Sequence, residues 1–383
     1  MLQVFLIALT GSAFICLLLV RSAVWHLPYS ADAPGGQPQK FHTSAVPRIG
    51  GLGIMAGILI ASLLAGPSGE AAMIYWFLLL SLLPAFIGGF IEDVTRRVPP
   101  WTRLLLTVVT AGFAYALVDV RFFRSDVDWL DTAFTFAPFA YFALMLAVAG
   151  VANAMNLIDG YNGLSAGVGA IILLAMGVVA AQSGDTLVAG LCFATAGALC
   201  GFLLLNYPDG RLFLGDGGAY LQGCVIALAA VMLIQRNPQV SPWFPFALVL
   251  YPIWETLFSM LRRLLRRAAL DQPDAQHLHS LVYRRLARRW VQGRDEQVKL
   301  LRNALTALPF WLVTALLAVM AVVWSDSTRA LQLLSMFFIV AYSAAYLKIS
   351  RLRRPITRAA AAYLRARAER RKTARAGAKT AAP

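Results

Sequence analysis

The chain alternates between long apolar runs and short polar segments. A helix needs roughly 20 apolar residues to cross the hydrocarbon layer of a bilayer, and most of the runs approach that length. They cover residues 2–24, 50–66, 73–91, 101–118, 135–156, 164–182, 186–205, 217–235, 243–261, 305–324 and 330–349. The pattern predicts an all-α polytopic membrane protein with about eleven transmembrane helices.

Two polar segments between and after these runs are long. Residues 262–303 separate the ninth and tenth runs, and residues 351–383 follow the last. We expect one transmembrane domain over 1–350, which includes the 262–303 loop, and then a basic cytoplasmic tail over 351–383. The tail holds eleven Lys or Arg against the single acid Glu369, which suits an arm lying on anionic headgroups. A solvated tail that only fixes topology is an equally good interpretation.

Composition supports a membrane protein, and the placement of charge predicts its orientation. The chain is 59% hydrophobic and 14% charged, with a net charge of +15. The loops after the even-numbered runs contain only four of the 34 basic residues, namely Arg121, Arg124, Arg236 and Arg329. The positive-inside rule then places the N-terminus in the periplasm and the C-terminus in the cytoplasm. This distribution argues against a nucleic-acid partner.

The four cysteines give no sign of a disulfide or a metal site. Cys16, Cys192, Cys200 and Cys224 lie within apolar runs and show no metal-binding spacing. We interpret them as small buried hydrophobic residues.

Each of the five loops predicted to be cytoplasmic carries an unusual polar stretch. They are "FHTSAVPRIGG" (41–51), "FIEDVTRR" (90–97), "NAMNLIDGYNG" (153–163), "NYPDGRLFLGDGGAY" (206–220) and "DAQHLHS" (274–280). Taken singly, these stretches are ordinary turn signals, and two histidines two residues apart do not share a helix face for zinc. Five such stretches on one face favour an active site.

Four acids lie where an apolar run meets the cytoplasm: Glu92, Asp93, Asp159 and Asp216. Acids at such positions are costly unless they are solvated, paired or bound to a cation. If the helix ends converge, a divalent metal or basic side chains must offset the repulsion between the acids. Mg²⁺ is the natural candidate, with Mn²⁺ as an alternative, because it takes oxygen ligands from carboxylates, phosphates and water.

The ordered set "PRIGG", "FIEDV", "NAMNLIDGYNGL", "NYPDGRLFLGDGGAYLQG" and "DAQHLHSLVYRR" resembles the polyprenyl-phosphate N-acetylhexosamine-1-phosphate transferases, in particular the WecA-like branch. The resemblance covers residues from about 40 to 285. It implies a multi-pass enzyme of the bacterial inner membrane whose active site faces the cytoplasm. Polyprenyl (undecaprenyl) phosphate would attack a UDP-N-acetylhexosamine such as UDP-GlcNAc, releasing UMP and starting a surface glycan such as O-antigen.

The resemblance also implies roles for the acids and amides. Asp216 would be the main Mg²⁺ carboxylate, with Asp159 as a second, and Gly217 and Gly218 would leave room for phosphate. Asn156, Asn206 and Asn162 would bind the nucleotide-sugar, although the family usually has Asp at the last position.

Glu92 and Asp93 match an acidic pair that is often proposed to deprotonate the lipid phosphate. A phosphate monoester is already largely dianionic at neutral pH. We therefore hypothesise that Asp93 instead orients the phosphate through a basic neighbour or the metal.

The remaining candidates are basic. His277 and His279 would donate to phosphate or sugar oxygens, and Ser280 stands where the family often has another histidine. Arg262 and Arg263 would bind diphosphate through their planar forks, with positive-inside anchoring as the alternative. Lys40 and Arg48 would meet the lipid phosphate.

Two other functions stay open at this point. A transporter or flippase could also use intramembrane acids, although it would more often carry them at mid-membrane in related halves. An inactive relative serving as a scaffold would fit the departures at Glu92, Asn162, Glu255 and Ser280. The sequence leaves open which UDP-sugar is used and whether the protein forms a homodimer.

Overall fold

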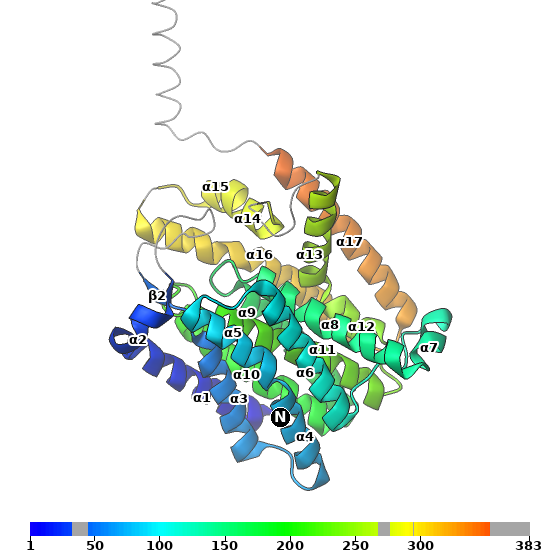
Figure 1. Cartoon of the computed structure of the whole chain (residues 1–383). Coiled ribbons are helices and arrows are strands. Elements are labelled where there is room, and N and C mark those ends of the chain that lie inside the picture. The colour runs from blue at the N-terminus through cyan, green and yellow to red at the C-terminus, as the bar shows by residue number, and fades with distance from the viewer. Residues whose placement is uncertain (33–44, 267–275, 294, 353–383) are drawn as a thin grey trace, which may run out of the picture.

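The structure is a computed structural model that describes residues 1–32, 45–266, 276–293 and 295–352 (Figure 1). Lys40 and most of the predicted basic tail lie outside these residues. The described chain is almost entirely helical. Its one sheet is a pair of two-residue antiparallel strands, in which Ala31 pairs with Pro47 and Asp32 with Val46.

The elements follow one another as a series of helices. In chain order they are α1 (Leu2–Arg21), α2 (Ala23–Ser30), β1 (Ala31–Asp32), β2 (Val46–Pro47), α3 (Gly50–Ala65), α4 (Glu70–Ser81), α5 (Leu83–Thr95), α6 (Pro100–Val118), α7 (Asp128–Phe134), α8 (Ala137–Leu157), α9 (Leu164–Gln182), α10 (Thr186–Asn206), α11 (Gly215–Arg236), α12 (Trp243–Leu248), α13 (Leu250–Leu265), α14 (Leu278–Val282), the π-helical η1 (Tyr283–Ala287), α15 (Arg288–Trp290), α16 (Glu296–Val323) and α17 (Thr328–Arg351).

The helices confirm an all-α polytopic membrane protein. Nine helical stretches in the described part of the chain are long and apolar enough to cross a membrane, with α4 and α5 together forming one of them. The predicted run 73–91 is broken at Leu82, just before Pro84, because proline lacks the N–H that a continuous helix needs. The run 243–261 is likewise divided, at Val249. Because α3 is also short, the count of eleven spans and their orientation stay predictions.

Helix α11 is the centre of the bundle. It packs against α3, α5, α8 and α9, and nearly all of its residues are buried. At the periphery, α1 packs closely on α3 and α10 through glycines. A Cβ on Gly57 would lie 2.7 Å from the carbonyl oxygen of Ala8, and one on Gly201 would lie 2.3 Å from that of Leu9. Such small residues let membrane helices approach each other closely.

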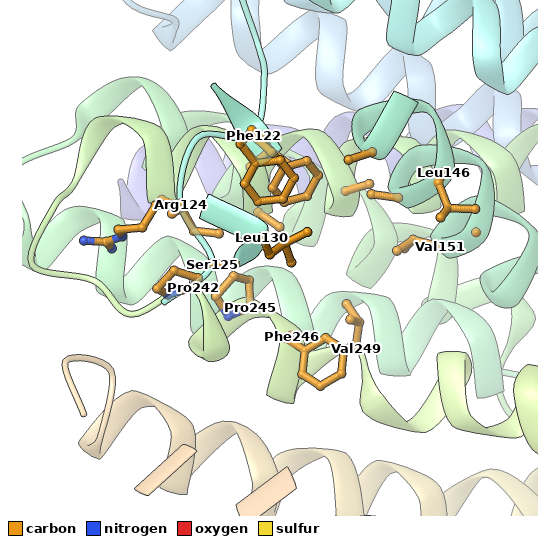
Figure 2. A pocket seen from close by; sticks show the side chains of 18 of the residues that line it. Phe122, Arg124, Ser125, Leu130, Leu146, Val151, Pro242, Pro245, Phe246 and Val249 are labelled. Carbon is orange, nitrogen blue, oxygen red and sulfur yellow. The ribbon is translucent and has the colours of Figure 1, made fainter. Parts of the chain in front are cut away.

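An apolar cavity of about 680 Å³ lies between α8, α11 and the divided helix α12–α13 (Figure 2). Phe122, Leu146, Val151 and Phe246 are among the side chains that line it. Arg124 lies at its edge and donates to the carbonyl oxygens of Pro238 and Val240. The lining is almost entirely apolar, so the cavity suits hydrocarbon.

Candidate active site

The site is built around the first turn of α11, which is capped by an acid from another helix. Gly215 begins α11 with φ +74°, a conformation that favours glycine. The carboxylate of Asp93, on α5, accepts the backbone N–H of Asp216 at 2.7 Å and that of Gly217 at 2.9 Å. Asp93 is only 1% exposed. It therefore satisfies two of the unpaired N–H groups of the helix start and places its charge at the positive end of the helix dipole.

Three side chains from other segments converge on the carboxylate of Asp216. Arg48, which follows β2, places Nη2 3.3 Å from Oδ1 of Asp216 and 3.7 Å from Oδ1 of Asp93. Arg103, on α6, forms an ion pair with Oδ2 of Asp216. Asn156, at the end of α8, donates its amide N–H to Oδ1 at 3.2 Å. Segments more than 160 residues apart thus meet at one carboxylate.

Arg103 is the residue that sequence reasoning missed. It lies one turn inside the apolar run 101–118, and its charge there was a signal that it faces a polar partner. The positive-inside pattern offered a simpler explanation for any arginine on this side of the membrane, so the pattern alone did not single it out.

Asp159, in the turn between α8 and α9, lies near Arg48 and Asp93. Burial raises the pKa of Asp159 to about 7, and the nearby guanidinium of Arg48 lowers it again in part. Glu92 is directed elsewhere, because its Oε2 accepts the N–H of Val98 at 2.7 Å and so closes the turn after α5. The catalytic roles predicted for these two acids stay predictions.

The prediction that Gly217 and Gly218 leave room for phosphate is wrong, because other helices fill that space. A Cβ on Gly51, in α3, would lie 2.4 Å from the backbone nitrogen of Gly218. One on Gly89, in α5, would lie 2.6 Å from the carbonyl carbon of Asp216. The N–H of Gly217 is already bonded to Asp93. These glycines let α3 and α5 pack directly on the start of α11.

Gly51→Ala is therefore expected to displace the start of α11. A misplacement of about 1 Å can lower a reaction rate by about 10²-fold, and we expect the activity of the purified protein to fall by about this factor. The matched control is Gly190→Ala in α10, where an added Cβ has no atom within 4 Å. Activity and melting temperature in detergent should change little in the control. Equal effects of the two substitutions would contradict the packing argument.

Two of the predicted substrate-binding amides hold the loops in place. Asn162 is 3% exposed; its side chain donates to the carbonyl of Pro208 at 2.8 Å, and its backbone N–H donates to Oδ1 of Asn303 at 2.7 Å. Asn206 accepts the N–H of Gly163 at 2.6 Å and donates to the carbonyl of Leu212 at 2.7 Å. An aspartate at position 162 would have no N–H for the Pro208 carbonyl, which explains the amide there. Contact of either side chain with a substrate stays a prediction.

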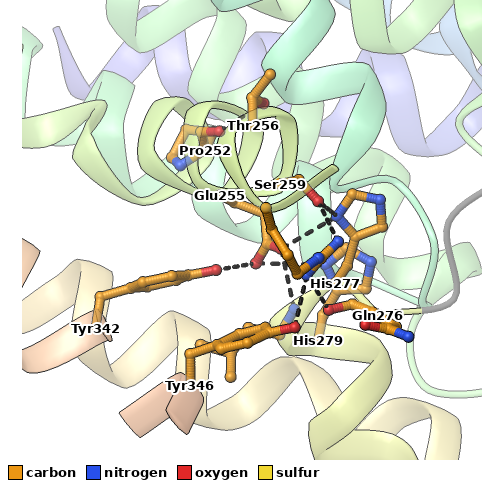
Figure 3. Close-up of polar contacts among 11 residues, drawn as sticks. Pro252, Glu255, Thr256, Ser259, Gln276, His277, His279, Tyr342 and Tyr346 are labelled. Atoms are coloured by element: carbon orange, nitrogen blue, oxygen red, sulfur yellow. Dashed lines mark hydrogen bonds and ion pairs between the residues drawn. The ribbon is translucent and has the colours of Figure 1, made fainter. Parts of the chain in front are cut away.

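The predicted histidines and arginine of the fifth loop form a buried cluster with α13 and α17 (Figure 3). Arg262 donates to the carbonyl of Gln276 and the hydroxyl of Tyr346, both at 2.7 Å, and to the hydroxyl of Ser259 at 2.8 Å. It thus anchors the loop, and its contact with diphosphate stays a prediction. Arg263 is half-buried beside it.

The fifth loop also contacts the third. The ring of Tyr161 packs edge-on against His279, with centroids 5.6 Å apart, and lies 5.4 Å from the ring of Tyr283. All five polar stretches therefore contribute at least one described residue to a single region at one end of the bundle.

Comparison with known proteins agrees with this arrangement. The model of glycosyl transferase family 4 matches residues 75–234, which include Glu92, Asp93, Asp159 and Asp216. The chain is 26% identical to the probable undecaprenyl-phosphate N-acetylglucosaminyl 1-phosphate transferase of Bacillus subtilis (strain 168). The aligned region has 314 residues and covers 82% of each of the two chains.

Two further relatives carry the name undecaprenyl-phosphate alpha-N-acetylglucosaminyl 1-phosphate transferase. The protein of Yersinia pestis is 28% identical over 258 residues, or 64% of this chain and 68% of the relative. That of Escherichia coli (strain K12) is 27% identical over 253 residues, or 64% of this chain and 67% of the relative. Together with the ordered motifs and their convergence at one site, these matches show that the chain is similar to glycosyl transferase family 4.

Proposed function

We propose that the protein transfers N-acetylglucosamine 1-phosphate from UDP-GlcNAc to undecaprenyl phosphate, at the cytoplasmic face of a bacterial inner membrane. The product, undecaprenyl-diphosphate-GlcNAc, would start a surface glycan. The observation that carries the proposal is the pair of guanidinium groups, Arg48 and Arg103, that meet at Asp216 where the helices end. The names of the relatives support the acceptor lipid and the sugar.

The main obstacle to this reaction is the repulsion between two anions. The lipid phosphate attacks the β-phosphorus of the donor, a new P–O–P bond forms, and the bond to UMP breaks. Because one phosphoanhydride replaces another, the reaction is close to thermoneutral. Phosphoryl transfer is helped chiefly by positioning and by cations near the phosphate oxygens. Arg48 and Arg103 are placed to supply such charge, and Asp93 keeps Arg48 and Asp216 together.

The residues at the site fit a magnesium ion. Mg²⁺ is usually held by one or two carboxylates, and phosphates and water complete its coordination. Asp216, Asp159 and the amide oxygen of Asn156 would be its ligands from this chain. No group of three or more His, Cys, Asp or Glu that could hold a metal occurs among the described residues, and phosphates and water would complete the coordination. When bound, the ion would neutralise charge on the diphosphate.

The apolar cavity beside α8 and α12–α13 supports a lipid acceptor. Its aromatic and aliphatic lining could take part of the polyprenyl chain while the phosphate lies at the polar end of the bundle (Figure 2).

The test is release of UMP by the purified protein given undecaprenyl phosphate, Mg²⁺ and a panel of UDP-sugars. We expect release that depends on the lipid and is fastest with UDP-GlcNAc. Lipid-dependent release with another UDP-sugar would keep the reaction and change the donor. No release with any donor, from protein that melts cooperatively, would overturn the proposal.

Removal of divalent metal is expected to abolish UMP release. Chelation with EDTA should lower the rate at least 10²-fold, and added Mg²⁺ should restore it, because the two arginines alone leave part of the diphosphate charge uncompensated. Mn²⁺ is expected to substitute in part. Full activity after exhaustive chelation would contradict the assignment of a metal.

A further inference from the structure

The last helix in the described part of the chain, α17, reaches the histidine loop, although it lies far outside the part matched by the family model. Tyr342 and Tyr346 lie one turn apart on α17. The hydroxyl of Tyr342 donates to Oε2 of Glu255 at 2.8 Å, and the hydroxyl of Tyr346 accepts from Arg262 at 2.7 Å (Figure 3). Glu255 and Arg262 lie two turns apart on α13, so α17 is bonded to α13 at both points.

Glu255 is a buried carboxylate surrounded by donors. It is 1% exposed, and its Oε1 accepts the backbone N–H of Leu278 at 3.0 Å. The same oxygen lies 3.2 Å from Nδ1 of His277, while Oε2 lies 4.0 Å from Nδ1 of His279. A buried carboxylate needs such partners, because an unpaired charge in the interior is costly.

The two imidazole rings present the same edge to this carboxylate. Their centroids are 5.2 Å apart and their planes differ by 12°. Because both Nδ1 atoms face Glu255, both Nε2 atoms lie on the far side of their rings. The Nε2 of His279 faces the third loop, where a Cβ added to Gly160, the residue after Asp159, would lie 3.7 Å from it.

A carboxylate at one ring nitrogen determines what the other can do. It keeps a proton on Nδ1, so that Nε2 is the nitrogen presented to the site, and it holds the ring in one orientation. Ser259 lies 3.2 Å from Nδ1 of His277 and also restrains that ring.

We infer that Glu255 is a positioning residue, which fixes the tautomer and orientation of His277, and that Tyr342 fixes Glu255 in turn. The inference rests on the proposed function, in which the histidines meet phosphate or sugar oxygens of the donor. It makes α17 part of the apparatus that aligns the substrate.

The first test is a mutant cycle on kcat for UMP release. Glu255→Gln should lower kcat by about 10- to 100-fold, the usual effect of removing a partner that orients a histidine. In the His277→Asn, His279→Asn background, which keeps a donor near the Nδ1 positions but has no atom at Nε2, Glu255→Gln should change kcat less than twofold. The same loss in both backgrounds would show a structural role and overturn the inference.

The second test isolates α17. Tyr342→Phe should lower kcat several-fold, because it removes one donor from the carboxylate and leaves the histidines present. The matched control is Ser335→Ala, which removes a buried hydroxyl bonded only to the backbone of the same helix and should leave kcat within twofold. Equal effects of the two substitutions would contradict the role given to Tyr342.

The third test needs no turnover. The chain has four histidines, so protein with ¹⁵N-labelled imidazoles gives four ring systems, which single-histidine variants assign. His277 should carry Nδ1–H in the wild type and should shift toward Nε2–H in Glu255→Gln, because the amide presents an N–H to the ring. Unchanged tautomers would overturn the inference. If the tautomers shift but no UDP-sugar is consumed, the proposed function fails while the positioning role stands.

Discussion

Asp216→Asn is expected to lower the rate of UMP release by about 10³-fold in protein that remains folded. The carboxylate of Asp216 is where Arg48, Arg103 and Asn156 meet, and it is the proposed metal ligand. An amide has no charge to hold two guanidinium groups and binds Mg²⁺ weakly. Loss of one preorganised electrostatic contact at a reacting phosphate or oxyanion typically costs about 10²–10³ in rate, and this substitution disturbs several at once.

The measurement is initial UMP release at saturating donor and lipid. The matched control is Asp209→Asn in the same loop, whose carboxylate is exposed and pairs only with Arg211 at 3.0 Å. Its activity should stay within twofold of the wild type, since exposed pairs contribute little. Retention of more than a tenth of the activity by Asp216→Asn would contradict the role assigned to this acid.

Asp93→Ala is expected to give the largest loss of stability together with a loss of activity. The substitution leaves the N–H groups of Asp216 and Gly217 without their acceptor inside the protein, at about 1–3 kcal/mol each. It also removes a partner of Arg48. We expect a clear fall in melting temperature in detergent, whereas Thr95→Ala, exposed on the same helix, should melt like the wild type.

Asp93→Asn separates this capping role from a general-base role. The amide oxygen can still accept one N–H, so the protein should be more stable than Asp93→Ala. Because the lipid phosphate is largely dianionic without help, activity should be low at pH 6 and pH 8 alike. Substantial activity at pH 8 that disappears at pH 6 would instead indicate that Asp93 removes a proton from the lipid.

Apolar runs were sufficient to predict the helices, because a bilayer imposes length and hydropathy on every span. The breaks within the predicted runs were harder to predict. Pro252 was a signal for the division of the run 243–261 at Val249, but a proline does not always end a helix, since Pro309 lies inside α16. Pro84 was a visible signal for the break between α4 and α5.

The convergence of distant acids followed from the order of the motifs, but the partner of each acid did not. Arg103 meets Asp216 only because α6 lies beside α11, a contact between helices that the sequence does not state. The glycines show the same limit. A glycine that makes room for phosphate and one that makes room for a neighbouring helix, such as Gly51, look alike in a sequence.

The most direct test is exchange of labelled UMP into UDP-GlcNAc, catalysed by the purified protein with undecaprenyl phosphate and Mg²⁺. If Asp216, Arg48 and Arg103 form one site for a nearly thermoneutral phosphoanhydride exchange, label should appear in UDP-GlcNAc only when the lipid is present, and Asp216→Asn should suppress it. Folded wild-type protein that incorporates no label, or incorporates it equally with Asn at position 216, would contradict the account.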